Sequence, residues 1–299
     1  MIVIEAEGLC KNFGEVRALD GVSFKVKKGK VFGFLGPNGA GKTTTVRILT
    51  GIIKPDSGYA WVNGYDVVRE KLKVKNSIGV LPEISNAYPD LTAWQNLMLI
   101  SSLYGIKRRE AEKRANELLK EFGIIERKDS KVRGFSKGMK QRLMLCMVLI
   151  SDPKIVFLDE PTSGLDVKSA RMIREKILEM EREGKTVFLT SHNMDEVNML
   201  CDEIAIINKG KIVVVDTPER IKQRVGGSVA VEVSFNKKVE LDAKRFGDKY
   251  IIYTTDPYET ICEIVEFARK NGLKIVSINT RTPTLEDAFL KLLEMEEVE

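Results

Sequence analysis

The residues best suited to chemistry begin with a glycine-rich loop. Residues 36–43 read Gly-Pro-Asn-Gly-Ala-Gly-Lys-Thr and fit the pattern G-x-x-x-x-G-K-[ST]. The glycines let backbone N–H groups turn inward around phosphates, and the helix expected after the loop points its positive end at them. We expect Lys42 to reach the β- and γ-phosphates and the Thr43 hydroxyl to bind Mg²⁺. The phosphate-binding residues predicted here are Gly36, Pro37, Asn38, Gly39, Ala40, Gly41, Lys42, Thr43 and Thr44.

Two adjacent acids form a second signal. Asp159 and Glu160 end the apolar strand signal IVFL. Side chains alternate along a strand, so Asp159 can orient a Mg²⁺ ligand shell while Glu160 faces an attacking water. Open α/β sheets bind ligands at the carboxyl ends of their strands, where the glycine-rich loop is also expected. The alternative is that the two acids cap the next helix, which Pro161-Thr162 could support.

A third signal is the start of an apolar helix at Ser136-Lys137-Gly138. Ser136 stands in an N-cap position, where its hydroxyl can accept a hydrogen bond from the first turn. A helix N-terminus that carries a hydroxyl and a bare glycine backbone is also a suitable anion site. Taken alone, this segment favours an ordinary cap over an anion site.

Apolar strands that alternate with helices predict how these residues are positioned. The segment up to Val31 reads as short strands and turns, and the strand VFGFLG then runs directly into the loop and a helix over 43–49. From about Pro82 to Ser151 the pattern becomes helical, and after it strands and helices alternate again. This alternation indicates a parallel sheet covered on both faces, which is an α/β fold.

The C-terminal part differs from the rest. A polar join, TPERIKQRVGGS, suggests a domain boundary near Val225. Residues 226–299 then read as strand, strand, helix, strand and helix, which predicts a small α+β domain. It carries no catalytic constellation, so a dimerisation or docking role is favoured over binding of a small ligand.

Length and composition set further limits. A chain of 299 residues with 43% hydrophobic and 30% charged residues suggests two domains with an ordinary core. The net charge of +5 is spread along the chain, and no Lys/Arg cluster predicts a nucleic-acid partner. The four cysteines form no CxxC pair, and the N-terminus lacks a secretory signal pattern. The longest apolar run, 143–150, is shorter than the roughly 20 residues that a membrane helix needs.

In the order of these elements, residues 2–220 resemble the ATP-binding cassette (ABC) ATPases. FSKGMKQR stands at the family's signature sequence, and IVFLDE at the strand with the metal-binding and catalytic acids. Phe13 matches the aromatic residue that stacks on adenine, and Asp166 ends the dimer-contacting loop Ser163-Gly164-Leu165-Asp166. His192, the only histidine, matches the switch histidine that contacts the γ-phosphate. The resemblance implies catalytic roles for Glu160, His192 and Lys42, and ATP and Mg²⁺ as cofactors.

The resemblance also implies the architecture. Residues 1–225 would form a P-loop NTPase cassette, with a mixed sheet core, an antiparallel β subdomain and a helical subdomain at about 83–151. Residues 226–299 would be the α+β appendage. Two copies would close around two ATP·Mg, with Ser136 and Gly138 of one copy placed against the ATP held by the other. Thr43, Asp159 and Glu83 would be the residues near Mg²⁺.

Two departures from the family pattern stand out. Glu83 occupies the place of the usual glutamine between the lobes, which adds negative charge near a triphosphate. In the signature, Lys137 and Met139 replace a glycine and a glutamine, while Ser136 and Gly138, which would face phosphate, are present.

FSKGMKQR, IGVLPE and PTLEDAFLKL are most similar to the branch that serves drug, antibiotic or other export-type permeases. This predicts an ATPase subunit of a transporter, at the cytoplasmic face of the membrane, with a separately encoded transmembrane permease and a second copy or a paralogous cassette as partners. The alternative is a soluble ABC ATPase that acts on ribosomes or DNA. Members of those classes carry two cassettes, long coiled coils or zinc sites, and none of these is evident in the sequence.

Overall fold

The chain folds into two compact units. The structure, a computed structural model, describes residues 1–84, 87–224, 229–241, 243–281 and 283–298. The first unit is Met1–Val215 and the second is Asp216–Glu299. The boundary predicted near Val225 lies outside the described residues.

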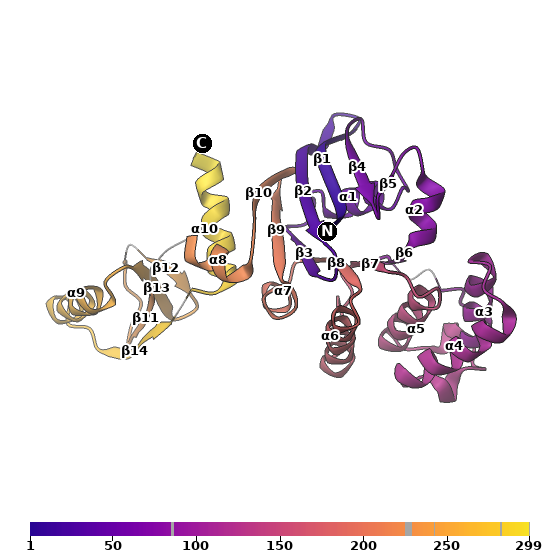
Figure 1. Cartoon of the computed structure of the whole chain (residues 1–299). Helices are drawn as coiled ribbons and strands as arrows, with labels where there is room; N and C mark the ends of the chain where they lie inside the picture. The colour runs from indigo at the N-terminus through magenta and orange to yellow at the C-terminus, as the bar shows by residue number, and fades with distance from the viewer. Residues whose placement is uncertain (85–86, 225–228, 242, 282, 299) are drawn as a thin grey trace. The chain divides into compact units, whose positions relative to one another are not determined.

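An antiparallel sheet forms one layer of the first unit, with strand order β2-β1-β4-β5 (Figure 1). In β2, Val22, Phe24 and Val26 are buried and alternate with exposed neighbours, as expected for a sheet that covers a core on one face only. The strands are β1 (Ile2–Phe13), β2 (Val16–Lys27), β4 (Ser57–Val62) and β5 (Tyr65–Asp66).

The central sheet is the second layer, with strand order β10-β9-β3-β8-β7-β6. From β9 to β6 the neighbouring strands are parallel. Every residue of β3, β7 and β8 is buried, so their continuous apolar runs are covered on both faces, as predicted. The strands are β3 (Val31–Leu35), β6 (Ile78–Leu81), β7 (Ile155–Asp159), β8 (Thr186–Ser191), β9 (Glu203–Asn208) and β10 (Lys211–Asp216).

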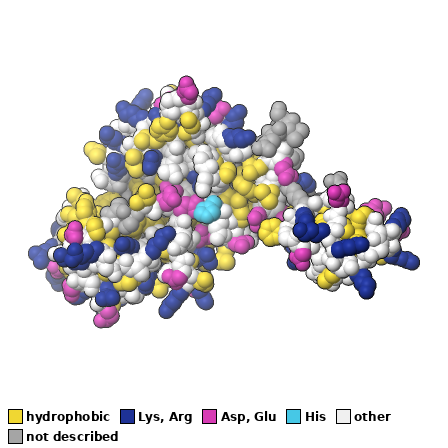
Figure 2. Space-filling model, turned by 180° about the vertical axis from the view of Figure 1, so that it is seen from behind, with side chains coloured by type: hydrophobic (Ala, Val, Ile, Leu, Met, Phe, Trp, Pro, Cys, Tyr) yellow, Lys and Arg dark blue, Asp and Glu magenta, His cyan; other side chains and the backbone are white. Residues whose placement is uncertain are grey.

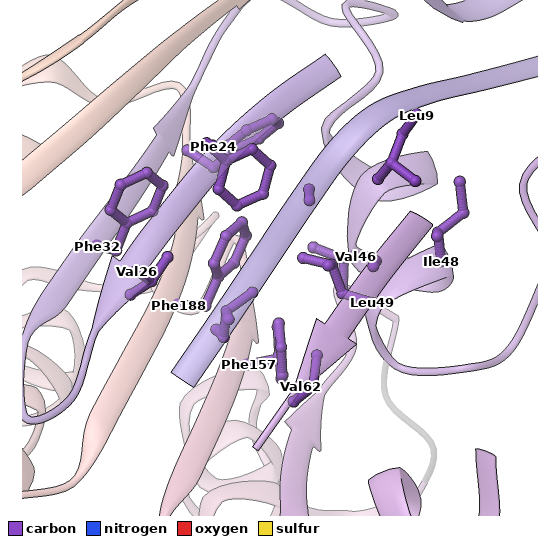
Figure 3. Packing of buried hydrophobic residues seen from close by; sticks show 14 of the residues in the cluster. Leu9, Phe24, Val26, Phe32, Val46, Ile48, Leu49, Val62, Phe157 and Phe188 are labelled. Carbon is purple, nitrogen blue, oxygen red and sulfur yellow. The ribbon is translucent and has the colours of Figure 1, made fainter. Parts of the chain in front are cut away.

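Aromatic rings fill the space between the two sheets (Figure 3). The ring of Phe24 from β2 lies 5.6 Å from that of Phe32 and 5.9 Å from that of Phe188, centroid to centroid. A methyl group added to Gly33 would project from the opposite face of β3. There it would crowd the side chains of Val197 and Cys201, at the C-terminal end of the helix over 194–200. The alternation of Phe32 and Gly33 therefore lets one strand pack against a sheet on one side and a helix on the other.

Helices complete the first unit, and the helical pattern expected from about Pro82 to Ser151 is confirmed by three helices over 93–103, 108–121 and 137–149. A capping box between Thr92 and Gln95 begins α3. The polar stretch after β4 contains α2, a helix that the sequence pattern did not predict. The helices are α1 (Lys42–Leu49), α2 (Lys71–Ser77), α3 (Ala93–Leu103), α4 (Arg108–Glu121), η1 (Ile125–Arg127), η2 (Val132–Gly134), α5 (Lys137–Leu149), α6 (Val167–Arg182) and α7 (Met194–Leu200).

The second unit is an antiparallel sheet with strand order β12-β13-β11-β14, together with helices. The predicted α+β character is confirmed, but the polar join proposed over 217–228 contains helix α8. The elements are α8 (Pro218–Arg224), β11 (Val229–Phe235), β12 (Lys244–Phe246), β13 (Lys249–Thr254), α9 (Pro257–Lys270), β14 (Ile275–Arg281) and α10 (Leu285–Val298).

A polar cluster ties α10 to this sheet. Arg281 of β14 forms ion pairs with Glu232 of β11, at 2.5 Å, and with Asp287 of α10. The Tyr253 hydroxyl donates to Asp287 at 2.5 Å, and the N–H and the hydroxyl of Thr284 each donate to the same carboxylate at 2.8 Å. Burial alone raises the pKa of Asp287, but the hydrogen bonds from Arg281 and Tyr253 outweigh it and hold that pKa well below its usual range.

Within the described ranges, no helix combines the length and the apolar character that a membrane crossing requires.

Candidate active site

A cavity of about 430 Å³ lies where β3, β7 and β8 end, the edge predicted from the strand pattern. Loop residues that follow each of these three strands reach it. Its lining residues are Ala18, Pro37, Asn38, Gly39, Gly41, Lys42, Thr43, Thr44, Glu83, Glu160, Ser163 and His192. The structure thus brings together most of the predicted loop residues, the acid Glu160, the histidine and Glu83.

The loop between β3 and α1 needs its glycines for space and for backbone geometry. A methyl group on Gly36 would overlap the carbonyl oxygen of Ile207 in β9. Gly41 has a φ of 110° and is the N-cap of α1, where a methyl group would come within 2.7 Å of the Ala18 carbonyl oxygen. The N-cap of α1 has no side-chain cap. A helix N-terminus of this kind presents backbone N–H groups and a positive dipole end to the cavity.

Lys42 is the buried cation of the site. Its Nζ donates hydrogen bonds to the carbonyl oxygens of Gly36, at 2.7 Å, and Pro37, at 3.2 Å. It lies 3.8 Å from Oε1 of Glu160. Burial lowers the pKa of Lys42, while Glu160, Asp159 and Glu83 oppose that shift. These contacts hold the Lys42 ammonium group next to the N-terminus of α1. An ammonium group in this position can bind the oxygens of a polyphosphate.

Glu160 and His192 form a hydrogen-bonded pair in the lining of this cavity. The Nδ1 atom of His192 lies 2.8 Å from Oε2 of Glu160. Glu160 is largely buried, whereas the side chain of His192 is 59% exposed. Figure 2 shows the single histidine in cyan at the surface, beside acidic side chains in magenta. A carboxylate held between Lys42 and an imidazole is placed to accept a proton within a cavity that solvent reaches.

Asp159, the other acid, is not among the residues that line the cavity. It is buried, and its Oδ1 accepts a hydrogen bond of 2.5 Å from the Thr190 hydroxyl of β8. The backbone N–H of Glu160 also donates to Thr190, to its carbonyl at 3.2 Å and to its hydroxyl at 3.1 Å. Glu160 itself has a φ of 51°, which turns the chain sharply after β7. The alternative that the two acids cap the next helix is wrong, because the N-cap of α6 is Asp166.

A metal ion would need more ligands than the chain supplies here. Thr43 and Glu83 line the cavity, and Asp159 lies buried beside it. Among the described residues, no group of three or more His, Cys, Asp and Glu side chains could hold a metal ion by itself. Hydroxyl and carboxylate oxygens suit Mg²⁺, which usually takes one or two carboxylates together with substrate phosphates and waters. The donor set therefore fits a Mg²⁺ ion that phosphates help to bind.

Several predicted residues lie outside the lining of this cavity, as far as the structure describes the chain. Phe13 ends β1 with 49% of the residue exposed, and Lys11 Nζ lies 5.7 Å from its ring centroid. The Asp166 carboxylate caps α6 by accepting hydrogen bonds from Ser169 N, at 2.9 Å, and Ser169 Oγ, at 2.8 Å. These bonds lower the pKa of Asp166. The residues in this group are Phe13, Gly36, Ala40, Ser136, Gly138, Asp159 and Asp166.

The start of α5 is joined to the turn that carries Glu160. Ser136 is its N-cap, as predicted, and its hydroxyl accepts from Met139 N at 3.2 Å. The buried Gln141 amide donates to the Pro161 carbonyl at 2.8 Å. A methyl group on Gly138 would overlap the Ser169 hydroxyl of α6. Packing against Ser169 within the chain is therefore enough to require glycine at position 138, which the sequence position did not reveal.

Residues around Glu196 were not predicted to belong to the site. Glu196 of α7 accepts hydrogen bonds from Thr162, which follows Glu160, and from Ser191, which precedes His192. Thr190, Ser191 and Glu196 are all buried. Strand β8 belongs to the alternation of strands and helices expected after Ser151, but its neighbours in the sheet cannot be read from its own sequence.

Comparison with known proteins places these features in a family. A sequence model of the family described as "ABC transporter" matches residues 19–163. The linearmycin resistance ATP-binding protein LnrL of Bacillus subtilis is 34% identical over 304 aligned residues, which cover 97% of this chain and 98% of that protein. The Nod factor export ATP-binding protein I of Ralstonia nicotianae is 35% identical and covers 97% of this chain and 93% of its own.

A solved structure agrees. An ATP-binding cassette in a dimeric post-hydrolysis state, bound to ADP and Pi, superposes with a TM-score of 0.66 and 26% sequence identity. The match covers 72% of this chain and 98% of that cassette. These comparisons favour the transporter interpretation over an ATPase that acts on ribosomes or DNA.

Proposed function

The chain belongs to the ATP-binding proteins of ABC transporters, and from this we infer that it binds and hydrolyses ATP as the subunit that drives an exporter. The observation that carries the proposal is the meeting of Lys42, Glu160 and His192 in one cavity at the N-terminus of α1. A positive helix end, a buried ammonium and a carboxylate–imidazole pair are groups suited to hydrolysis of a γ-phosphate.

We propose that the ATP phosphates lie along residues 36–44. Backbone N–H groups of the loop and the Lys42 ammonium would face the β- and γ-phosphates. Phe13 would stack on the adenine from the end of β1, where its ring is exposed. When ATP is bound, Lys42 would exchange the carbonyl oxygens that it contacts here for phosphate oxygens, which are stronger acceptors.

Mg²⁺ would be held by Thr43 and Asp159 together with the phosphates, and Glu83 would add a carboxylate in the place of the family's usual amide. The ion would neutralise charge on the phosphate oxygens. The Thr190 hydroxyl already orients one oxygen of Asp159, which supports a fixed direction for this carboxylate.

In hydrolysis, Glu160 would accept a proton from water as the water oxygen attacks the γ-phosphorus. The bond from that phosphorus to the β,γ-bridging oxygen breaks, which leaves ADP and inorganic phosphate. The hydrogen bond from His192 holds the Glu160 carboxylate at the cavity, and the exposed imidazole can also contact the γ-phosphate.

The complete site would require a second cassette. Ser136 and Gly138 lie at the start of α5, outside the cavity that holds Glu160. We propose that they face the ATP bound by a partner copy or a paralogous cassette, so that two subunits enclose two nucleotides. The dimeric state of the related cassette supports this arrangement. Closure around ATP and opening after hydrolysis would then move the attached permease.

A separately encoded permease would place the protein at the cytoplasmic face of the membrane and would select the cargo. The names of the relatives, with linearmycin resistance and Nod factor export among them, support export as the direction. Affinity purification of the intact protein from detergent-solubilised membranes tests the assignment. Recovery of a polytopic membrane protein, with ATPase activity in the complex, is the expected result. Recovery of ribosomes or DNA in its place would contradict it.

A further inference from the structure

Glu196 is a buried carboxylate that the reaction described above does not use. It lies in α7, and only 1% of the residue is exposed. Removing an ionised carboxylate from water is energetically costly unless partners compensate its charge. The partners of Glu196 therefore indicate what this acid does in the fold.

Three separate segments of the first unit supply those partners. Arg174 of α6 donates from Nε to Oε1 at 3.2 Å. The Thr162 hydroxyl, in the turn after β7, donates to Oε2 at 2.9 Å, and the Ser191 hydroxyl at the end of β8 donates to the same oxygen at 3.1 Å. One carboxylate thus joins α6, the turn that follows Glu160 and the strand end that precedes His192.

The first of these links bears on Glu160. Thr162 lies two positions after Glu160, in a turn closed by a hydrogen bond from Ser163 N to the Glu160 carbonyl at 3.2 Å. The φ of Glu160 is 51°, a conformation that costs energy for a residue with a side chain and persists only where its surroundings hold it. The bond between Thr162 and Glu196 is one of those constraints.

The second link bears on His192. Ser191 and Asn193 flank the histidine, and both are held to α7. The Ser191 hydroxyl accepts from Asn193 N at 3.0 Å while it donates to Glu196. The Asn193 side chain in turn accepts from Glu196 N at 3.0 Å, as the N-cap of α7. The backbone on both sides of the histidine is therefore fixed relative to Glu196.

We propose that Glu196 is a positioning residue that sets the distance between the Glu160 carboxylate and the His192 ring. It contacts neither side chain directly and acts through Thr162 and Ser191. The inference rests on the roles proposed above for Glu160 and His192 in ATP hydrolysis. Because a displacement of about 1 Å can cost about 100-fold in rate, a hydrogen-bonded junction between the two loops is a means of keeping that distance.

The single histidine allows a direct test, because its ring gives the only imidazole signals in an NMR spectrum of the labelled full-length protein. Glu196→Gln retains the shape of the side chain and removes its charge. We expect the His192 ring signals to shift, turnover at saturating ATP to fall about tenfold, and the KM for ATP to stay within about threefold. Glu175→Gln is the matched control, because Glu175 is exposed on α6 and pairs with Arg171 at 2.8 Å.

Two further variants break one link without removing the charge. Thr162→Val should shift the ring signals and lower turnover less than Glu196→Gln does, and Thr162→Ser, which retains the hydroxyl, should resemble the unmodified protein. These variants also serve if Glu196→Gln fails to fold.

The outcomes separate the possibilities. Ring signals and turnover equal to those of Glu175→Gln would overturn the proposal. So would a loss of turnover, or of thermal stability, with unmoved ring signals, because Glu196 would then act elsewhere. Shifted ring signals with unchanged turnover would support the positioning by Glu196 and contradict the role proposed for His192 in hydrolysis.

Discussion

Oε2 of Glu160 lies 2.8 Å from Nδ1 of His192, although the two residues are 32 positions apart in the sequence. Neighbouring parallel strands bring them together, since Asp159 at the end of β7 is registered with Thr190 near the end of β8. The residues that follow each strand therefore emerge on the same edge of the sheet. The proximity of acid and imidazole follows from this register, and it defines the first prediction.

Glu160→Gln is expected to lower the rate of ATP hydrolysis about 100-fold or more, because an amide cannot accept the proton of the attacking water. ATP affinity should change by no more than about threefold, since Lys42 and the loop residues are unaltered. Release of phosphate and equilibrium binding of a labelled nucleotide measure the two quantities. Glu117→Gln, an exposed change on α4, is the control. Hydrolysis at the normal rate would sink the general-base assignment.

Glu83→Gln tests the carboxylate that lines the cavity in place of an amide. Removing a negative charge should weaken attraction for Mg²⁺ and reduce repulsion of the triphosphate. We expect the Mg²⁺ concentration for half-maximal ATPase activity to rise severalfold, and ATP binding measured in EDTA to become tighter. Glu126→Gln, outside the cavity lining, is a suitable control. An unchanged or lower Mg²⁺ requirement, or weaker ATP binding in EDTA, would argue against this electrostatic role.

Gly36→Ala should destabilise the protein by about 1 to 3 kcal/mol, because the added methyl group overlaps the Ile207 carbonyl oxygen behind the loop. Gly134→Ala is the matched control, since nothing lies within 4 Å of a methyl group there. It should change stability by less than about 0.5 kcal/mol. Denaturant unfolding of both variants measures the difference. Equal midpoints would show that the loop moves to accept the methyl group.

Gly138→Ala separates packing within the chain from contact with a second subunit. The methyl group would overlap Ser169 Oγ, so the variant should be less stable, and Ser169→Ala should restore much of the lost stability. If Gly138 faces the nucleotide of a partner, the double variant should still hydrolyse ATP at least about tenfold more slowly than Ser169→Ala alone. Full recovery of activity in the double variant would mean that only the packing within the chain requires glycine.

Asp287→Asn should weaken the second unit at neutral pH by about 2 kcal/mol, because it removes a charged acceptor from Arg281. The folded pKa of Asp287 lies below its unfolded value, so its contribution is present above the unfolded pKa, near 4, and is lost as the pH falls toward the folded pKa. The difference in unfolding free energy between the variant and the unmodified protein should therefore shrink in acid. A difference that stays constant from pH 7 to pH 3 would contradict this linkage.

Local signals in the sequence predicted much of the fold. The apolar runs VFGFLG and IVFL predicted β3 and β7, and the helical pattern from about Pro82 to Ser151 predicted the segment that contains α3, α4 and α5. Helix α8 was overlooked although Thr217 caps it and Pro218 begins it, because its polar composition resembles a linker. The three-residue strand β12 is too short to show a period.

The candidate site was predictable only where one segment carries a pattern. The loop at 36–43 and the acids after β7 have such patterns, and the structure brings Lys42 and Glu160 within 3.8 Å. Thr190, Thr162 and Glu196 carry none. Their importance depends on the order of strands in the sheet and on the packing of α7, which are long-range features that periodicity does not encode.

The hydrogen bond from the Gln141 side chain to the Pro161 carbonyl spans 2.8 Å in the interior of the first unit. It fastens the helix that begins at Ser136 to the turn that holds Glu160. In a pair of such subunits, these two ends would serve different nucleotides. A displacement of either end would then be passed to the other, which would couple the two reaction centres. In a dimer of two identical subunits, a single substitution near this bond would alter both reaction centres. We therefore expect this turn to tolerate few substitutions.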